Sequence, residues 1–388
     1  MIDFTLSDEQ SLIVETVRDF VRRELMPHDD MIEKLGYVPD EMVADIRRKS
    51  IEAGLYSMNM PVELGGGGLD YVTRSFCTEE FARAGAGLSS LVHQPTQILL
   101  ACVGEQRERY LLPTIRGERM ECFALTEPGA GSDARAIQTR AVRDGDDWIL
   151  NGTKQFISHA DHADFIIAFA VTGQDETPRG PRSRITSFLV DKDLDGVDVQ
   201  PLEVVSCRGY NPSIITFSDV RVPDTNILGQ EGHGFDFAND WLYSGRVMLG
   251  AMCLGRAKYI LELSADWAAT RKAFGHVIGD YQGISFKLAE MQMLIRATEL
   301  LVLNGAWQLD RGTLSAEDAS IVNLHASEMV GTVADHGVQI FGGMGLSKEF
   351  PMERLWRDAR AERIWEGTSE IHHHIIGRSI VRAYTKSR

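Results

Sequence analysis

The side chain best suited to proton transfer is Glu366, which lies in the segment 365–370 with the sequence WEGTSE. A carboxylate followed by a glycine, on a loop that flanks a helix, is placed to point into a cleft. A free glutamate has a pKa of about 4.3, which suits it poorly to remove a weakly acidic proton near neutral pH. Burial raises the pKa of a carboxyl group. A glutamate at this place could therefore act as a general base if the fold buries it.

A second candidate site is the segment 124–133, with the sequence ALTEPGAGSD. Its glycines allow the backbone to approach a flat or anionic ligand closely. Thr126 and Ser132 supply hydroxyl groups, and exposed backbone amides can bind an anion. A tight polar turn without any ligand fits the same residues, so both interpretations stay open at this point.

Three regions of different patterning must position these residues. We predict an N-terminal helical domain over 1–120, a middle β domain over 121–230 and a C-terminal helical bundle over 231–388. The order of helices, strands and helices indicates an α+β fold. No G-x-G-x-x-G motif is present, so a bound nucleotide would not be held by a Rossmann unit. Long proline-free stretches predict that single helices cross the C-terminal region at 247–270, 285–310 and 316–341.

Two local signals predict where elements begin and turn. The segment 7–10 has the form of a capping box, so a helix should begin there. Asn151-Gly152 follows the apolar run 148–150 and predicts a β-hairpin turn at that place.

Composition argues against several classes of function. The net charge is −16 and the pI about 5.2, whereas a nucleic-acid-binding protein needs a basic footprint. The sequence contains no run of about 18 apolar residues, so we expect no membrane-spanning helix. The N-terminus also lacks the basic residues with which a signal peptide begins. We therefore expect a cytoplasmic protein that binds neither nucleic acid nor membrane. The run 372–374 is His-His-His, but consecutive helical residues point in different directions, so we expect no metal site.

Taken together, these motifs resemble the acyl-CoA dehydrogenase family. The resemblance runs from Phe4 to the C-terminus, with the order and spacing of the motifs preserved. It rests on the two segments above and on five further matches: 154–158 (KQFIS), 219–223 (DVRVP), 271–275 (RKAFG), Gln282 and 339–345 (QIFGGMG).

The resemblance implies an acyl-CoA dehydrogenase-like fold with a β-barrel-like middle domain and a C-terminal four-helix bundle. It implies FAD-dependent α,β-dehydrogenation of an acyl-CoA thioester to the trans-2-enoyl-CoA. Glu366 would take the α-proton and flavin N5 the β-hydride, and the electrons would pass to electron-transfer flavoprotein. A homotetramer with FAD shared between subunits is expected on the same ground.

The resemblance also assigns residues. The cofactor would be bound by Phe123, Leu125, Thr126, Ser132, Phe156, Ile157, Ser158, Arg271, Phe274, Gln282, Gln339, Gly343, Thr368 and Glu370. The substrate would be bound by Ser132, Tyr243, Arg246, His93, Trp365 and Gly367.

The sequence departs from the family pattern beside the expected base. Some relatives carry the base at the position of Gly245, which cannot act as one, so Glu366 has no rival. Tyr243 stands where several relatives have an acidic residue, and Trp365 where tyrosine is frequent. Trp365 fits a bulkier wall for a short or unusually shaped acyl group, or an aromatic face for a cationic one.

The acyl chain itself is not fixed by these residues. Three other activities on the same scaffold stay open: an oxidase that uses oxygen, a DNA-associated flavoprotein, and a non-oxidising enzyme such as a desulfinase.

Overall fold

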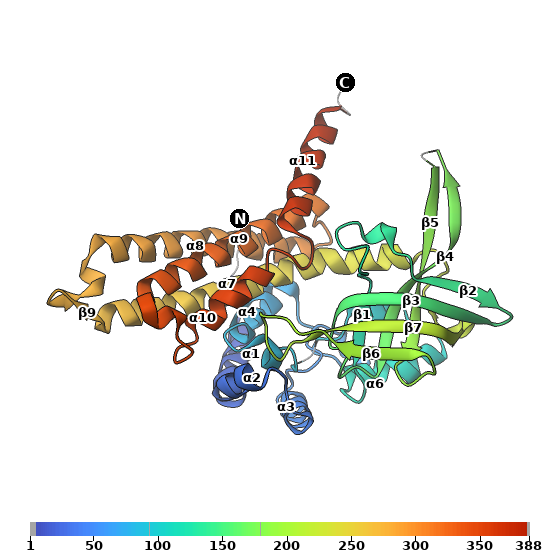
Figure 1. Cartoon of the computed structure of the whole chain (residues 1–388), viewed down its shortest axis with the longest axis horizontal. Helices are drawn as coiled ribbons and strands as arrows, with labels where there is room; N and C mark the ends of the chain where they lie inside the picture. The colour runs from blue at the N-terminus through green and yellow to red at the C-terminus, as the bar shows by residue number, and fades with distance from the viewer. Residues whose placement is uncertain (1–4, 93, 179, 386–388) are drawn as a thin grey trace.

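A computed structural model describes residues 5–92, 94–178 and 180–385 of the chain. Helices precede and follow one curled β-sheet, and a long helical region extends away from that sheet (Figure 1). This arrangement confirms the predicted α+β fold and its order of helices, strands and helices. The exact domain boundaries at 120 and 230 stay a prediction.

The N-terminal helices begin where the sequence predicts. The Ser7 side chain accepts from the Gln10 N–H, and the Gln10 side chain accepts from the Ser7 N–H, which completes the predicted capping box. The helices of this region are α1 (Asp8–Phe20), α2 (Asp29–Leu35), α3 (Asp40–Glu52), α4 (Tyr71–Phe81), α5 (Ala86–Ser89) and α6 (Leu112–Ile115), joined by short 3-10 and π turns.

The middle region forms an eight-stranded sheet in the order β6-β7-β3-β2-β4-β5-β8, with β1 paired in parallel to β4. Buried apolar side chains alternate along β3 and β7, so the sheet has an inner face that packs on its own core. The strands are β1 (Glu121–Ala124), β2 (Arg140–Asp144), β3 (Asp147–Ser158), β4 (Phe165–Thr177), β5 (Gly180–Asp191), β6 (Val197–Pro201), β7 (Pro212–Pro223) and β8 (Ile227–Leu228).

The predicted hairpin turn at Asn151-Gly152 is wrong, because β3 runs straight through both residues. The turn that joins β2 and β3 lies at 145–146 instead. The Asn151 side chain bonds Asp219 of the neighbouring strand, at 2.9 Å. At Gly152 a Cβ atom would lie 2.4 Å from Thr139 Oγ1, so glycine is needed for close strand approach at a β-bulge and not for a turn.

The three long helices predicted for the C-terminal region are confirmed as α7 (Gly234–Thr270), α8 (Gln282–Asp310) and α9 (Ala316–Phe341). They pack around a continuous apolar core together with α10 (Met352–Ala361). A two-stranded ribbon, β9 (Lys272–Ala273) and β10 (His276–Val277), joins α7 to α8 at the end far from the sheet (Figure 1). The last helix, α11 (Ser369–Thr385), projects from the bundle.

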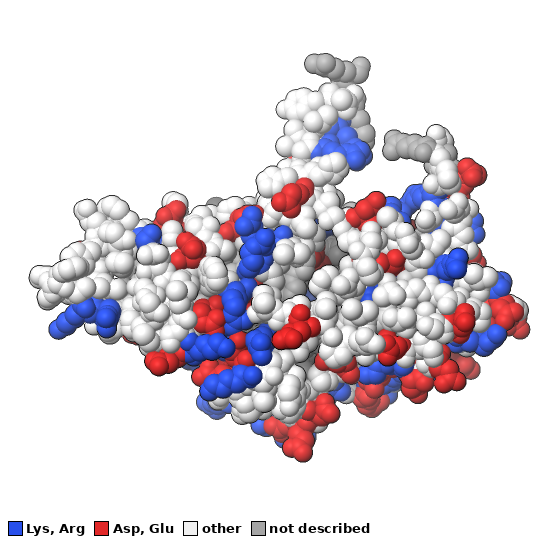
Figure 2. Space-filling model, viewed as in Figure 1, with Lys and Arg blue, Asp and Glu red and all other residues white. Residues whose placement is uncertain are grey.

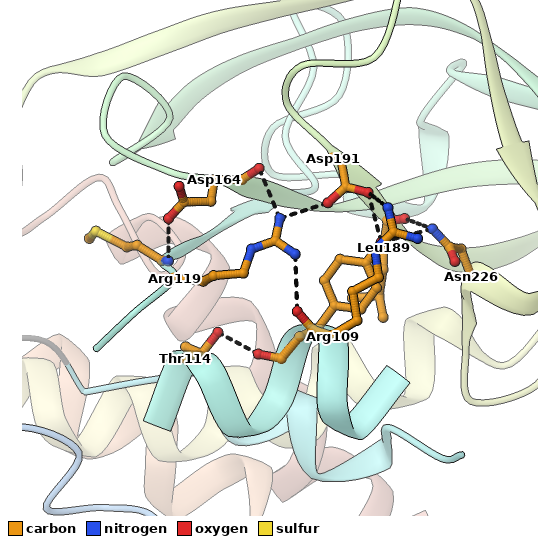
Figure 3. Close-up of polar contacts among 9 residues, drawn as sticks. Arg109, Thr114, Arg119, Asp164, Leu189, Asp191 and Asn226 are labelled. Carbon is orange, nitrogen blue, oxygen red and sulfur yellow. Dashed lines mark hydrogen bonds and ion pairs between the residues drawn. The ribbon is translucent and has the colours of Figure 1, made fainter. Parts of the chain in front are cut away.

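A polar network attaches the end of the N-terminal region to the sheet (Figure 3). The buried carboxylate of Asp191, at the end of β5, pairs with Arg119 at 2.6 Å and also with Arg109. The Tyr110 hydroxyl donates to Asp191 at 3.0 Å and accepts from Asn226. These contacts fix the segment 107–119 against the end of β5.

Charged side chains of both signs are interspersed over the face shown in Figure 2. Where blue side chains gather in the figure, over the helical part, red ones lie directly beside them. Among the helices of the described residues, none is long and apolar enough to cross a lipid bilayer.

Candidate active site

Glu366 lies in the loop between α10 and α11, and the backbone there is unusual. Its φ is +55°, and the φ of Gly367 is +105°. The residue as a whole is half-buried, but its Oε2 atom is inaccessible and has no hydrogen-bond partner in the described structure. Burial raises the pKa of the Glu366 carboxyl to about 7, although the nearby Arg246 guanidinium acts in the opposite direction. The Glu366 carboxyl group therefore has a pKa that suits it to accept a proton near neutral pH.

Two residues of α7 frame this carboxyl group. A Cβ atom at Gly245 would lie 3.2 Å from Glu366 Oε2, so the missing side chain leaves room for the carboxylate. The next residue, Arg246, is 7% exposed and donates from Nε to the Glu366 carbonyl oxygen at 3.3 Å. Its guanidinium also lies 5.7 Å from the centre of the Tyr243 ring. The structure therefore brings together Glu366, Gly367, Arg246 and Tyr243 of the predicted site.

The Trp365 side chain is hydrogen-bonded to one member of a buried ion pair. Its indole Nε1 donates to Glu362 Oε2 at 2.6 Å. Glu362 is fully buried and pairs with Arg256 of α7, which is 2% exposed. Trp365 is thereby fixed by its polar end, and the backbone of the adjacent Glu366 is fixed with it.

His372 is the second buried titratable side chain beside the loop. It is fully buried, and neither ring nitrogen has a hydrogen-bond partner in the described structure. A Cβ atom at Gly367 would lie 3.1 Å from His372 Nε2, so the ring packs directly against the glycine backbone. Burial, and to a smaller extent the Arg246 charge, lowers the pKa of His372 to about 4, so the imidazole is neutral at pH 7.

The three consecutive histidines have different surroundings. His372 is buried, whereas His373 and His374 are exposed, and His373 contacts the Ser369 carbonyl oxygen at 2.8 Å. Within the described residues, no three His, Cys, Asp or Glu side chains gather in a way that could hold a metal ion.

The ends of β1 and β3 form the side of the site predicted to receive FAD. The Gln155 N–H donates to the Thr126 carbonyl oxygen at 2.9 Å, which joins the two predicted cofactor segments. A β-bulge in β3 places Phe156 at φ +59° with 56% of its surface exposed. An exposed aromatic ring two residues before the hydroxyl of Ser158 fits a flat, hydrogen-bonding ring system, so these residue types fit the cofactor.

Not every predicted cofactor residue presents its side chain there. Phe123 stacks on Trp241 with ring centres 4.5 Å apart, and Leu125 and Ile157 are buried in the core. Ser132 lies on an exposed turn. The predicted role of each of these residues stays a prediction, as does that of His93, which lies outside the described residues.

The remaining predicted cofactor residues lie away from Ser158. Arg271, Phe274 and Gln282 lie at the β9–β10 end of the bundle, opposite to the sheet (Figure 1), and Phe274 is 95% exposed. Gln339 and Gly343 are exposed at the end of α9, whereas Thr368 and Glu370 begin α11 beside the base. One chain thus does not bring the Arg271 group and Ser158 together.

Two residues near the base were missed at the sequence level. Glu362 lies four positions before Glu366, and its distant partner Arg256 gave no local signal. Tyr210 lies in the loop between β6 and β7 and contacts Trp365 edge-on, with ring centres 6.1 Å apart. No motif marks Tyr210, because only the folded sheet carries this loop to the base.

Comparison with known proteins gives consistent matches over the chain. The family models described as the N-terminal, middle and C-terminal domains of acyl-CoA dehydrogenase match residues 7–118, 122–220 and 232–381. A 3-(aryl)acrylate reductase of Clostridium sporogenes is 37% identical over 97% of this chain and 99% of its own length. The caffeyl-CoA reductase-Etf complex subunit CarC of Acetobacterium woodii is 36% identical over 97% and 99% of the two chains.

Solved structures match equally well. Butyryl-CoA dehydrogenase from Megasphaera elsdenii superimposes with a TM-score of 0.90 at 32% identity, covering 98% of this chain and 100% of that one. A glutaryl-CoA dehydrogenase from Mycobacterium smegmatis in complex with FADH2 gives a TM-score of 0.87 at 27% identity, covering 97% and 95%.

Proposed function

Because this chain belongs to the acyl-CoA dehydrogenase family of FAD-dependent oxidoreductases, we propose that it oxidises an acyl-CoA thioester to the trans-2-enoyl-CoA with Glu366 as the base. The observation that carries this proposal is the Glu366 carboxyl group. It is inaccessible and unpartnered at Oε2, its pKa is raised to about 7, and it faces the gap left by Gly245. A general base works best when its pKa lies near the working pH.

The reaction removes a proton from the α-carbon and a hydride from the β-carbon of the acyl group. FAD, when bound, supplies the hydride acceptor at N5 of its ring. The protein supplies the base: Glu366 takes the α-proton on Oε2 and becomes a neutral acid. Since the neutral acid is the form that burial favours, the buried site assists this transfer.

The loop around Glu366 also orients the reaction. Arg246 holds the Glu366 carbonyl oxygen, Glu362 holds Trp365, and His372 packs under Gly367. The backbone N–H of Glu366 would donate to the thioester carbonyl oxygen and stabilise the negative charge that develops there. A donor that is already in position costs no reorganisation during the reaction. The contacts that hold this loop therefore support a role for the Glu366 N–H.

The assembly and the electron acceptor are part of the proposal. FAD would lie between Phe156 and Ser158 of one chain and Arg271, Phe274 and Gln282 of another, because these groups lie far apart in one chain. Exposed apolar side chains on α8 provide a surface for such a contact: Phe286, Met293 and Leu300. We propose a homotetramer in the cytoplasm with electron-transfer flavoprotein as acceptor, and CarC is named as part of a complex with that kind of partner.

The test is an anaerobic titration of the FAD-loaded protein with a panel of acyl-CoAs. The panel contains short, branched, acidic and cationic acyl chains, and arylpropanoyl chains because one relative is named for aryl acrylates. We expect loss of the flavin absorbance near 450 nm with at least one member, together with formation of the enoyl-CoA. No bleaching with any member would contradict the proposal, and rapid peroxide formation in air would identify an oxidase instead.

A further inference from the structure

Tyr210 lies between the loop that carries Glu366 and the end of strand β3, where Ser158 is predicted to contact the cofactor. It lies between β6 and β7, where its N–H donates to the Cys207 carbonyl oxygen at 2.9 Å. Its ring meets Trp365 edge-on, with centres 6.1 Å apart and planes at 86°. It also meets His159 edge-on, at 4.7 Å and 83°. Trp365 directly precedes the base, and His159 directly follows Ser158, so Tyr210 contacts the neighbour of each.

The hydroxyl of Tyr210 lies in the electrostatic surroundings of the same two groups. The Ser158 side chain is near enough to lower the pKa of Tyr210 through hydrogen bonding, and the Glu366 carboxylate is near enough to raise it. Burial, as the largest cause, raises the pKa of Tyr210 to about 12, so the phenol is neutral and protonated at pH 7. A neutral phenol beside Ser158 can both accept and donate a hydrogen bond.

Trp365 has no freedom to turn away from Tyr210. Its Nε1–H donates to Glu362 Oε2 at 2.6 Å, and Glu362 is held by Arg256. The indole is therefore fixed at its nitrogen by Glu362 and contacted edge-on by Tyr210. Edge-to-face aromatic contacts of this kind favour one relative orientation of the two rings.

We propose that Tyr210 is a positioning residue for the dehydrogenation: its ring orients Trp365 and so the Glu366 loop, while its hydroxyl fixes the hydroxyl of Ser158 toward the cofactor. This inference rests on the proposed function. It adds a side chain that contacts both parts of the proposed site, the loop of the base and the end of β3 at the cofactor. The base and the cofactor edge come from segments about 200 residues apart (366 − 158 = 208). A single side chain that touches both keeps their separation constant, and a small misplacement in such a geometry costs rate steeply.

Two substitutions separate the two roles. Tyr210→Phe keeps the ring and removes the hydroxyl, and Tyr210→Leu removes both. Tyr110→Phe is the matched control, since it also deletes a buried tyrosine hydroxyl bond, to Asp191, without a described contact to Trp365, Ser158 or Glu366.

The measurements use the FAD-loaded protein. They are the flavin absorption spectrum and midpoint potential without substrate, and the rate of flavin bleaching by an acyl-CoA as a function of pH. For Tyr210→Phe we expect an altered spectrum or potential and bleaching about fivefold slower, the size expected for the loss of one neutral hydrogen bond. The pH profile should keep its position, because the ring still shields the carboxyl group.

For Tyr210→Leu we expect bleaching more than tenfold slower, with the acidic limb of the pH profile moved to lower pH. Water would reach Glu366, whose pKa is raised by burial and opposed only by Arg246. Of the two other titratable groups beside the loop, His372 is neutral over this range and Glu362 is paired with Arg256, so neither should obscure the shift.

Wild-type spectrum, potential, rate and pH profile in both variants would overturn the proposal, and so would equal effects from Tyr110→Phe. If Tyr210→Leu does not fold, the result for Tyr210→Phe alone decides whether the proposal stands, because phenylalanine keeps the aromatic ring and nearly the same volume. If no acyl-CoA bleaches even the wild-type protein, the proposed function fails. The spectrum and potential of Tyr210→Phe then still decide whether Tyr210 acts on the cofactor edge.

Discussion

Loss of the Glu362 carboxylate should destabilise the protein strongly, because Glu362 and Arg256 form an ion pair without access to water. Their exposures are 0% and 2%, so solvent does not screen the pair. Removing one partner of such a pair leaves the other charge buried alone and costs about 3–5 kcal/mol of unfolding free energy. We expect a loss of this size for Glu362→Gln, although the amide can still accept the Trp365 N–H.

The contact with Trp365 can be measured separately. Trp365→Phe keeps both charges of the ion pair and removes the hydrogen bond from Nε1 to the carboxylate, worth about 1.5–3 kcal/mol for a charged acceptor, together with part of the ring that contacts Tyr210. The loop of the base also loses its anchor, so flavin bleaching by substrate should slow in both variants. Glu52→Gln is the control, since it removes an exposed partner of Arg48 and should cost less than about 1 kcal/mol.

The assay is urea unfolding at one fixed concentration of protein and FAD, because binding and assembly shift apparent stability. The double variant Arg256→Met with Glu362→Leu should recover most of the loss, since neither charge of the pair is left without its partner. A Glu362→Gln protein within about 1 kcal/mol of wild type would refute the reasoning. So would a double variant as unstable as the single one.

Two further predictions concern the residues that surround the base loop. His372 is neutral in the folded protein, with a pKa lowered to about 4, whereas the unfolded histidine binds a proton below about pH 6.5. The contribution of His372 to stability should therefore be complete above pH 6.5 and fall as the pH decreases toward 4, by about 2 kcal/mol at pH 5. His372→Gln should lose this dependence in urea unfolding at pH 5 and pH 7, and exposed His374→Gln should retain it. A Cβ atom in Gly245→Ala would crowd Glu366 Oε2 at 3.2 Å, so bleaching should slow at nearly unchanged FAD binding. Gly331→Ala, where a Cβ meets nothing within 4 Å, should bleach at the wild-type rate, and equal rates in both glycine variants would exclude a role for the gap at Gly245.

The order of helices and strands was predictable because it depends on local patterns. The capping box at Ser7 and the long proline-free helices of the C-terminal region are properties of a few turns of chain. The prediction of a hairpin turn at Asn151-Gly152 was wrong, because tertiary packing and not the local sequence determines the backbone there. Gly152 is required by the close approach of Thr139, the residue directly before β2, which no local pattern reveals.

The same distinction applies to the site. Glu366 and Gly367 are adjacent in the chain, so their motif was visible, and the structure adds the buried Oε2 and the two positive φ angles. Trp365 was interpreted as a wall for the acyl group, but its bond to Glu362 gives it an anchoring role as well. That bond and the contact with Tyr210 depend on segments distant in sequence, so the residues alone could not predict them.

The central claim is that Glu366 is the base, and single-turnover reduction of Glu366→Gln tests it most directly. The FAD-loaded variant is mixed anaerobically with an excess of the acyl-CoA that bleaches the wild-type protein best, with exposed Glu349→Gln as control. A positioned general base contributes about 10²–10⁴-fold in rate, so we predict bleaching slower by at least about 10²-fold with FAD retained. Complete bleaching of Glu366→Gln at the wild-type rate would contradict the account.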